Sequence, residues 1–539
     1  MNGKVVVTLI IIIIVAFGIR LYKLDAVGLS FDEVNKIEAA KRYDRGDLSY
    51  NVEHPMLMKF LIWLTLSFST KWNEDMGNQH PNFRISDEAI TRFPNILAGA
   101  LTTLVIFFLS NELFNTTIAL YGAFLWATGI NAISINRIAK EDSFLVLFML
   151  AGFLYFWRGK SISNVDNKYR RRYYLLSGAF FGLMLASKYF PLYLGLNFLF
   201  HYTRRHNTPT NLALGKELLA KFFIILFITF IIINPSVFFP SNIHYLVNYL
   251  TENDVPHHGY EFNGRLYYNN FWKINNTTPI YFYLLFMLIK VPPVLLLAFL
   301  VGIYVSVKEA GNDSCYFLKF MLFFWLFSYS IVGAKWLRYT LSLMPWVYIT
   351  AAVGIYYIQS MINKISKQGF LHYVSYFIII ILLLSPILSI INIYPYYMLY
   401  VNIIGGGDKN QAKYFPHDEV YDAGMREAIE YIATNAPLNG TIISDATEVV
   451  RFYAHKYNRQ DLISLPISKS EFQHHCEPSD SLYIIEQKGR RYFENEKCLD
   501  YVYQHYNPIF RVWISNVNTT NVYGKKGKHF NQNVIELFK

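Results

Sequence analysis

Two adjacent carboxylates, Asp32 and Glu33, lie in a polar stretch that directly follows the first apolar segment of the chain. Adjacent carboxylates at an apolar boundary raise each other's pKa, and such a pair suits either general-base catalysis or binding of a metal ion. An acidic turn at a membrane surface is the alternative interpretation. A second polar group follows, in which Glu53 and His54 precede Pro55 and Lys59.

The segments that must position these residues are apolar runs of membrane-spanning length. The chain of 539 residues is 53% hydrophobic and only 16% charged, whereas a soluble domain is about 25% charged. A helix needs about 20 apolar residues to cross a bilayer, and residues 1–394 contain about eleven such runs. The predicted helices cover approximately residues 4–23, 89–110, 116–136, 142–158, 173–187, 189–203, 217–236, 280–307, 317–334, 339–361 and 371–394.

The apolar runs stop at residue 395. Residues 395–539 alternate helix-like and strand-like stretches, and they are numerous enough for a separate soluble domain. The sequence therefore predicts a polytopic α-helical membrane protein with a C-terminal soluble α/β domain. The apolar stretch 55–72 is interrupted by Lys59, which favours an interfacial helix over a further span.

Basic residues cluster in alternate loops, which predicts that those loops face the cytoplasm of a cell membrane. They are Arg158, Lys160, Lys168, Arg170, Arg171, Arg172, Arg204, Arg205, Lys216, Lys308, Lys319, Lys364 and Lys367. The loops 24–88 and 237–279 and the domain 395–539 are then extracytoplasmic. This topology brings charged residues of five distant segments to the outer face, namely Asp32, Glu33, Glu141, Asp142, Lys188, Lys335 and Arg338.

The remaining polar features exclude some classes of function. The net charge of +11 is explained by the basic loops. Nucleic-acid binding is not expected, because the sequence has no module of basic and aromatic residues. The chain has no zinc-type spacing of cysteines, although Cys476 and Cys498 can pair if the C-terminal domain is exported. His257 and His258 have no matching ligands nearby, so a solvated loop is expected there rather than a metal site.

The order of several motifs resembles that of the protein O-mannosyltransferases. Phe31-Asp32-Glu33-Val34, followed by Glu53-His54-Pro55 and Lys59, is similar to the first external loop of that family. The further segments that resemble the family are Thr91 to Pro94 with Gly99 to Thr102, Arg137 to Ser143, Gly182 to Lys188, Lys290 to Pro293, Lys335 to Tyr339 with Pro345, and Tyr394 to Tyr397 with Gly405 to Gly407.

Together these matches span residues 25–407 and are specific for the broader superfamily of C-type glycosyltransferases. The chain departs from the family pattern at Asn35, where the family often has His, and at Met56, where it has a second Pro. The loop 237–279 is also too short for the central β-trefoil of the eukaryotic members. That absence leaves the identity of the acceptor open.

The resemblance implies transfer of a hexose, with mannose as the expected sugar, from a polyprenyl-phosphate donor to Ser or Thr of an exported protein. An enzyme that faces outward needs a donor that has crossed the bilayer, because nucleotide sugars are cytosolic. Transfer to a lipid or a cell-envelope glycan is the alternative reaction, and a lipid-phosphate transporter is the non-enzymatic alternative. No cofactor is expected to be required, with a divalent metal as the alternative.

By analogy with the family's first loop, Asp32 is the expected base, and Glu33 fixes the loop or assists. Arg92 and Arg338, backed by Lys335, are expected to bind the donor phosphate, because guanidinium groups bind phosphate oxygens in pairs.

Three further residues are expected at the substrate. His54 should contact the substrate, and Asp142 should orient an arginine or bind the acceptor, with a structural ion pair as its alternative. Lys188 is expected to assist there. For the lysines and arginines, a side chain that reaches from a helix end to the interface is the competing interpretation.

Overall fold

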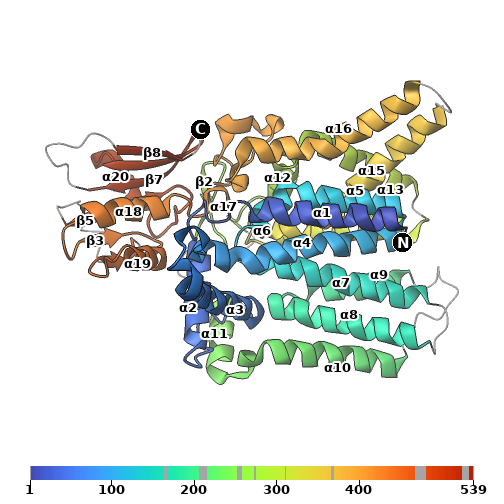
Figure 1. Cartoon of the computed structure of the whole chain (residues 1–539), viewed down its shortest axis with the longest axis horizontal. Helices are drawn as coiled ribbons and strands as arrows, with labels where there is room; N and C mark the ends of the chain where they lie inside the picture. Colours follow the sequence, from blue (N-terminus) through green and yellow to red (C-terminus); the bar gives the residue numbers. More distant parts are fainter. Residues whose placement is uncertain are drawn as a thin grey trace.

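The computed structural model describes residues 2–162, 167–204, 215–251, 258–271, 275–309, 311–365, 370–467, 481–524 and 533–537. Long helices lie side by side, and a sheet with its own helices lies at one end of this bundle (Figure 1). The first outer loop contributes α2 (Phe31–Tyr43) and α3 (Met56–Trp72), which lie where the bundle meets the sheet region. The chain is an integral membrane protein.

Each stretch predicted to be a membrane helix is helical. Several of these helices begin at an Asn or Ser whose side chain accepts a hydrogen bond from a backbone N–H of the first turn, as Asn2, Ser86 and Asn312 do,. The helices of the bundle are α1 (Gly3–Leu21), α4 (Asp87–Leu113), α5 (Thr116–Thr128), α6 (Ile130–Asn136), α7 (Asp142–Ser161), α8 (Lys168–Ser187), α9 (Leu192–Thr203), α10 (Lys216–Ile233), α12 (Phe282–Lys290), α13 (Pro293–Lys308), α14 (Asp313–Ile331), α15 (Met344–Ile365) and α16 (Phe370–Ile393).

Two of the predicted helices are broken. The stretch 116–136 bends by 54° between α5 and α6, and at Gly129 the ring of Tyr348 lies where a side chain would start. The stretch 280–307 is interrupted between α12 and α13 because Pro292 and Pro293 lack the N–H that would continue the helix,.

The number of membrane crossings differs with the criterion used. Among the described residues, five helices are long and apolar enough to cross a bilayer, or six if the bent pair α5–α6 is one span. Shorter apolar helices such as α13 lie within the same bundle. The predicted count of about eleven spans is therefore not confirmed, although the helical bundle itself is.

The two ends of the bundle differ in what they carry. The N-terminus and the ends of α7, α13 and α15 that carry basic residues lie at one end, and the sheet region lies at the other (Figure 1). These basic ends lie together, opposite the sheet region, and the side of the membrane that they face stays a prediction.

Short elements cover the end of the bundle that carries the sheet region. The amphipathic helix α11 (Pro240–Leu250) and a hairpin of β1 (Tyr260–Phe262) and β2 (Arg265–Tyr267) belong to the loop 237–279. The other short helices are η1 (Asn73–Gly77), η2 (Pro81–Phe83), η4 (Pro235–Phe238), η5 (Leu337–Ser342), η6 (Tyr397–Leu399), η7 (Ile403–Gly405), η8 (Gly407–Asn410) and α17 (Pro416–Val420).

The C-terminal region contains a six-stranded mixed sheet in the order β4-β3-β5-β7-β6-β8. Strand β3 pairs in parallel with β4 and β5, whereas β7 is antiparallel to β5 and β6. The elements are α18 (Met425–Asn435), β3 (Thr441–Ile443), α19 (Thr447–Lys456), β4 (Ile463–Leu465), β5 (Leu482–Gln487), α20 (Glu496–His505), β6 (Phe510–Ile514), β7 (Val517–Tyr523) and β8 (Asn533–Leu537). Cys498 of α20 is disulfide-bonded, and Cys476 lies outside the described residues.

The C-terminal region shares a hydrophobic core with the first outer loop. Leu29, Val34 and Ile37 are buried in the same cluster as Met425 and Tyr453. The Tyr453 hydroxyl also accepts a hydrogen bond from the Leu29 N–H at 2.7 Å. Helix α2, which carries the predicted catalytic carboxylates, is therefore packed between the bundle and the C-terminal region.

Candidate active site

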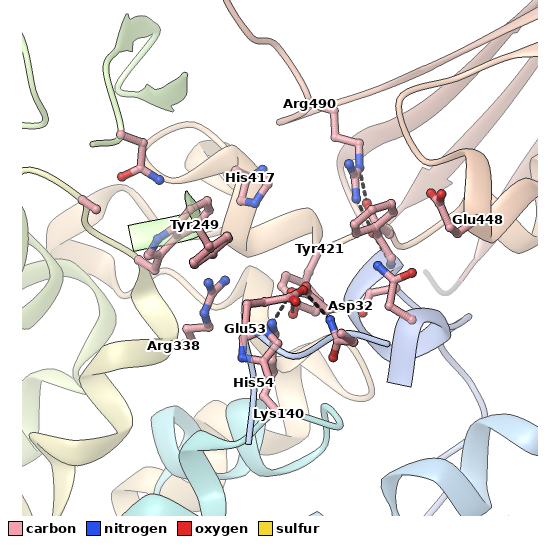
Figure 2. Close-up of a pocket in the computed structure, with 18 of the residues that line it drawn as sticks. Asp32, Glu53, His54, Lys140, Tyr249, Arg338, His417, Tyr421, Glu448 and Arg490 are labelled. Carbon is pink, nitrogen blue, oxygen red and sulfur yellow. Dashed lines mark hydrogen bonds and ion pairs between the residues drawn. The ribbon is translucent and has the colours of Figure 1, made fainter. Parts of the chain in front are cut away.

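A cavity of about 520 Å³ lies where the helical bundle, the first outer loop and the C-terminal region meet. Its polar lining comes from α2 and the loop 49–54, from the segment 334–339 that precedes and begins η5, and from residues 417–422 and 490–492. Figure 2 shows side chains from all three parts pointing into one space. Among the predicted site residues, Asp32, His54 and Arg338 line this cavity.

Asp32 lies in the first turn of α2 and faces the cavity. Its carboxylate forms an ion pair with Lys140 and accepts a hydrogen bond from the Tyr421 hydroxyl at 2.9 Å. Burial disfavours the charged carboxylate, but Lys140, Lys36 and Arg338 outweigh that effect and hold the pKa of Asp32 well below its ordinary value,. Asp32 is therefore ionised at neutral pH, and its side chain is 30% exposed toward the cavity.

Glu33 points away from the cavity and is fully buried. It accepts two hydrogen bonds of 2.8 Å from the Arg92 guanidinium, one from the Ala139 N–H and two from Ser30. With Ser30 it forms a capping box that begins α2,. The contacts of Glu33 fit the first of its two expected roles, which is to fix the loop. Its carboxylate does not line the cavity beside Asp32.

All the nitrogen atoms of the Arg92 guanidinium donate hydrogen bonds to the first outer loop. Besides Glu33, its guanidinium donates hydrogen bonds to the carbonyl groups of Leu24, Val27 and Gly28 at 2.7–3.0 Å. The expectation that Arg92 binds the donor phosphate is wrong for this structure, because Arg92 does not line the cavity and its donors already have acceptors.

We expect Arg92→Ala to destabilise the protein without a specific loss of donor binding. Removing one partner of a buried ion pair costs about 3–5 kcal/mol, because the other charge stays buried and unpaired. Thermal unfolding in detergent should show a lower midpoint, while the folded fraction should bind a lipid phosphate with unchanged affinity. A variant that unfolds at the normal temperature but no longer binds lipid phosphate would instead make Arg92 a donor ligand.

Arg338 presents a free cation to the cavity. Its guanidinium stacks over the Trp336 ring at 4.5 Å. In the part of the chain that the structure describes, no carboxylate or carbonyl group accepts a hydrogen bond from it. The buried Asp418 accepts a hydrogen bond from the Leu337 N–H at 3.1 Å and so fixes the start of η5. A positioned guanidinium without a protein acceptor is suited to bind an anion.

Lys335, Asp142 and Lys188 do not line the cavity. The Lys335 ammonium donates to the carbonyl groups of Thr278 and Val332 at 2.9 and 2.7 Å, so it holds the loop before η5. The Lys188 ammonium pairs with Asp142 at 2.8 Å and lies 4.3 Å from the centre of the Tyr339 ring, which does line the cavity. For Asp142 the structure shows the ion pair that was its alternative, and none of the three residues lies directly at the cavity.

The loop 49–54 forms one wall, and Lys59 holds its shape. The buried Lys59 ammonium donates to the carbonyl groups of Tyr50, Asn51 and His54. His54 lies 3.7 Å from Glu141, and burial lowers the pKa of its imidazole well below the ordinary value, so it is neutral at pH 7,. The same wall presents Glu53, whose carboxyl pKa is raised by burial.

Several lining residues were not predicted as site residues. Lys140 and Glu53 belong to the quoted motifs, but no pattern marked them as facing the cavity. Tyr421, His417 and Arg490 belong to the C-terminal region, in which the sequence shows no motif. Behind Lys140, the buried pair Lys36–Glu141 at 3.1 Å completes a charge network around the N-terminus of α2.

The charges of the site favour anion binding over metal binding. Within the described ranges, no three His, Cys, Asp or Glu side chains are grouped as metal ligands. His258 pairs with Glu494 at 2.9 Å, and His257 lies outside the described residues. The charge of the Asp32 carboxylate is already balanced by an ammonium partner, which reduces its attraction for a metal ion.

The cavity brings the Asp32 carboxylate and the Arg338 guanidinium together at the end of the bundle that carries the sheet region. A carboxylate can take a proton from a hydroxyl group, and cations can stabilise a phosphate leaving group, so these side chains have the chemistry that sugar transfer from a lipid phosphate needs. The comparisons with known proteins are consistent with that chemistry.

Residues 83–239 match the family model of the dolichyl-phosphate-mannose-protein mannosyltransferases. Among solved structures, the fold is similar to that of ArnT from Cupriavidus metallidurans bound to undecaprenyl phosphate, with 11% identity, a TM-score of 0.52, and coverage of 97% of this chain and 98% of that chain. It is also similar to the oligosaccharyltransferase of Archaeoglobus fulgidus, with 11% identity, a TM-score of 0.54, and coverage of 90% and 70%. No curated protein matches the sequence. The family match covers residues 83–239 only, and the similarity to the solved structures extends the fold over nearly the whole chain.

Proposed function

We propose that the protein transfers a sugar from a polyprenyl-phosphate donor to a hydroxyl acceptor in the cavity beside α2. The observation that carries the proposal is that the ionised Asp32 carboxylate and the free Arg338 guanidinium face the same space. They come from segments about 300 residues apart in the chain, and each is held by neighbours that leave its reactive face open.

The reaction needs one bond to form and one to break. The acceptor oxygen attacks the anomeric carbon of the sugar, and its proton passes to Asp32. The bond between the anomeric carbon and the phosphate oxygen breaks, and the electron pair stays on the lipid phosphate. Arg338 stabilises the negative charge that develops on that phosphate, with Lys140 as a second nearby cation. Lys140 also keeps Asp32 ionised before the reaction.

The donor class is supported by the related structures. ArnT was solved with undecaprenyl phosphate, and an archaeal oligosaccharyltransferase AglB was solved with an inhibitory peptide and a dolichol phosphate, the latter with 11% identity, a TM-score of 0.50 and coverage of 90% and 69%. Mannose as the sugar and a protein as the acceptor follow the family description, and a Ser or Thr of an exported protein is the acceptor expected from the sequence resemblance. Transfer to a lipid or a cell-envelope glycan is the second candidate, because the ArnT-like fold extends over almost the whole chain.

Radiolabelled polyprenyl-phosphate mannose, added to membranes that contain the protein, tests these alternatives. Label in the protein fraction supports the first acceptor, and label in the lipid or glycan fraction supports the second. Movement of intact donor between leaflets without transfer would indicate a transporter. A parallel reaction with a chelator tests the proposal that no metal is required, in which case transfer should be unchanged.

We further propose that the cavity and the C-terminal region are extracytoplasmic. The basic ends of the helices lie opposite the sheet region (Figure 1), and the disulfide at Cys498 fits an oxidising compartment,. A cysteine at the exposed Leu438 should react with an impermeant maleimide in sealed cells, whereas one at the exposed Lys168 should react only after permeabilisation. The parent chain is the background control, and labelling of Lys168→Cys in sealed cells would contradict the orientation.

A further inference from the structure

Two consecutive residues of the C-terminal region, Tyr421 and Asp422, form hydrogen bonds with Asp32 and Phe31 at the start of α2. The Tyr421 hydroxyl donates to the Asp32 carboxylate at 2.9 Å, and the Asp422 carboxylate accepts a hydrogen bond from the Phe31 N–H at 2.7 Å. Both Tyr421 and Asp422 have positive φ angles, of 44° and 64°. Residues other than glycine adopt such a backbone at an energetic cost, so the surrounding contacts must hold the turn in place.

Arg490 makes several of the contacts that hold this turn in place. Its guanidinium binds Asp422 through two hydrogen bonds, of 2.5 Å from Nε and 2.7 Å from Nη2, and it lies over the Phe31 ring at 5.5 Å. The loop that carries Arg490 can approach the turn because Gly489 has a φ of 90°, and a side chain there would collide with the backbone of His417. The hydrogen bonds therefore run from Arg490 to Asp422 and from Asp422 to the first turn of α2.

We infer that Tyr421 is a positioning residue for the base Asp32, and that the Asp422–Arg490 ion pair fixes Tyr421 and the first turn of α2 in the reactive geometry. This inference rests on the proposed function, in which Asp32 accepts the proton of the acceptor. It assigns a role in the reaction to the C-terminal region, since the hydroxyl that orients the base comes from there.

The groups around Asp32 determine how its titration should respond. Lys140 of the segment before α7, Lys36 on α2 itself and Arg338 of η5 favour its charged form, and Glu53 of the loop 49–54 also lines the same cavity. The Tyr421 hydroxyl adds a donated hydrogen bond, which stabilises the carboxylate. Loss of that bond should therefore raise the pKa of Asp32, and the acidic limb of the rate profile should move to higher pH.

Tyr421→Phe removes only the hydroxyl group. We expect kcat at neutral pH to fall about tenfold or more, which is the effect of losing one hydrogen bond to a charged group, while the KM for the donor changes little. The matched control is Tyr503→Phe, because the Tyr503 hydroxyl also donates to a carboxylate, Glu486 at 3.1 Å, within the same region but away from the cavity. Unchanged kcat and pH profile in Tyr421→Phe would overturn the inference.

Arg490→Lys tests the ion pair, since lysine keeps the charge but cannot form both hydrogen bonds. Its kcat should fall in the same direction as that of Tyr421→Phe. The matched control is Arg459→Lys, which alters a similar two-bonded pair with Asp461 outside the cavity. Equal losses of activity and of thermal stability in both arginine variants would reduce the pair to a structural role and overturn this part of the inference.

A titration without turnover separates this inference from the proposed function. The infrared band of the Asp32 carboxylate, assigned by its absence in Asp32→Asn, should titrate at higher pH in Tyr421→Phe than in the wild type. A shifted band together with no sugar transfer by the wild type would reject the proposed reaction but retain the contact that orients Asp32. An unshifted band in an enzyme that transfers sugar would reject the role of Tyr421 alone.

Discussion

Asp32→Asn is expected to lower the rate of sugar transfer about 10²- to 10⁴-fold, the usual effect of losing a general base. Asparagine keeps the shape of the side chain and still accepts the hydrogen bond that Tyr421 donates to this position. Binding of the lipid-phosphate donor should therefore remain nearly normal. Single-turnover transfer from a defined polyprenyl-phosphate sugar measures the rate, and donor affinity is measured separately.

Two comparisons make this prediction specific. Glu33→Gln should reduce thermal stability, because Glu33 is the buried partner of Arg92,. Its folded fraction should lose less activity than Asp32→Asn. Near-normal turnover by Asp32→Asn would refute the assignment, and Glu53, another carboxyl group that lines the cavity, would be the next candidate for the base.

Arg338→Ala is expected to weaken donor binding and also to slow transfer, because one guanidinium serves both the bound phosphate and the leaving phosphate. Loss of a charge that stabilises a developing anion lowers kcat by about 10²- to 10³-fold. Loss of a hydrogen bond to a charged ligand makes binding less favourable by about 1.5–3 kcal/mol. Equilibrium binding of undecaprenyl phosphate and single-turnover rates measure the two effects.

The chain offers a control for Arg338→Ala at the other end of the bundle. Arg158 also lies over an aromatic ring, that of Phe108 at 5.4 Å, but it is far from the cavity and pairs with Glu112. Arg158→Ala should bind undecaprenyl phosphate normally. If Arg338→Ala binds it normally as well, the phosphate site lies elsewhere and the proposed geometry of the reaction is wrong.

The helices and their order could be predicted from the sequence, because long apolar runs are a strong local signal. The breaks at Gly129 and at Pro292 were harder to place. The first depends on the distant Tyr348 ring, and a proline pair can either kink a helix or end it. Asp32, His54 and Arg338 were predicted from segments that resemble motifs of a known family, and they line the cavity.

The role of Arg92 could not be predicted from its residue type. A guanidinium near a phosphate site binds phosphate only if no protein carboxylate reaches it first, and Glu33 does so at two points. Tyr421 and Arg490 could not be found at all from local patterns. Their contribution depends on a turn with positive φ at two residues that are not glycine, and such a turn leaves no signature in the residue types.

The hydrogen bond between Tyr421 and Asp32 joins residues that are 389 positions apart, and it has a consequence for the timing of biosynthesis. During translation Asp32 emerges early and reaches the far side of the membrane long before Tyr421 is made. In that interval α2 lacks both its oriented carboxylate and the apolar partners Met425 and Tyr453 that bury Val34 and Ile37. Under the proposed orientation and function, we expect the base geometry to form only after the C-terminal region has crossed the membrane and folded onto α2, so chains still in the translocation machinery should be inactive toward the donor lipid.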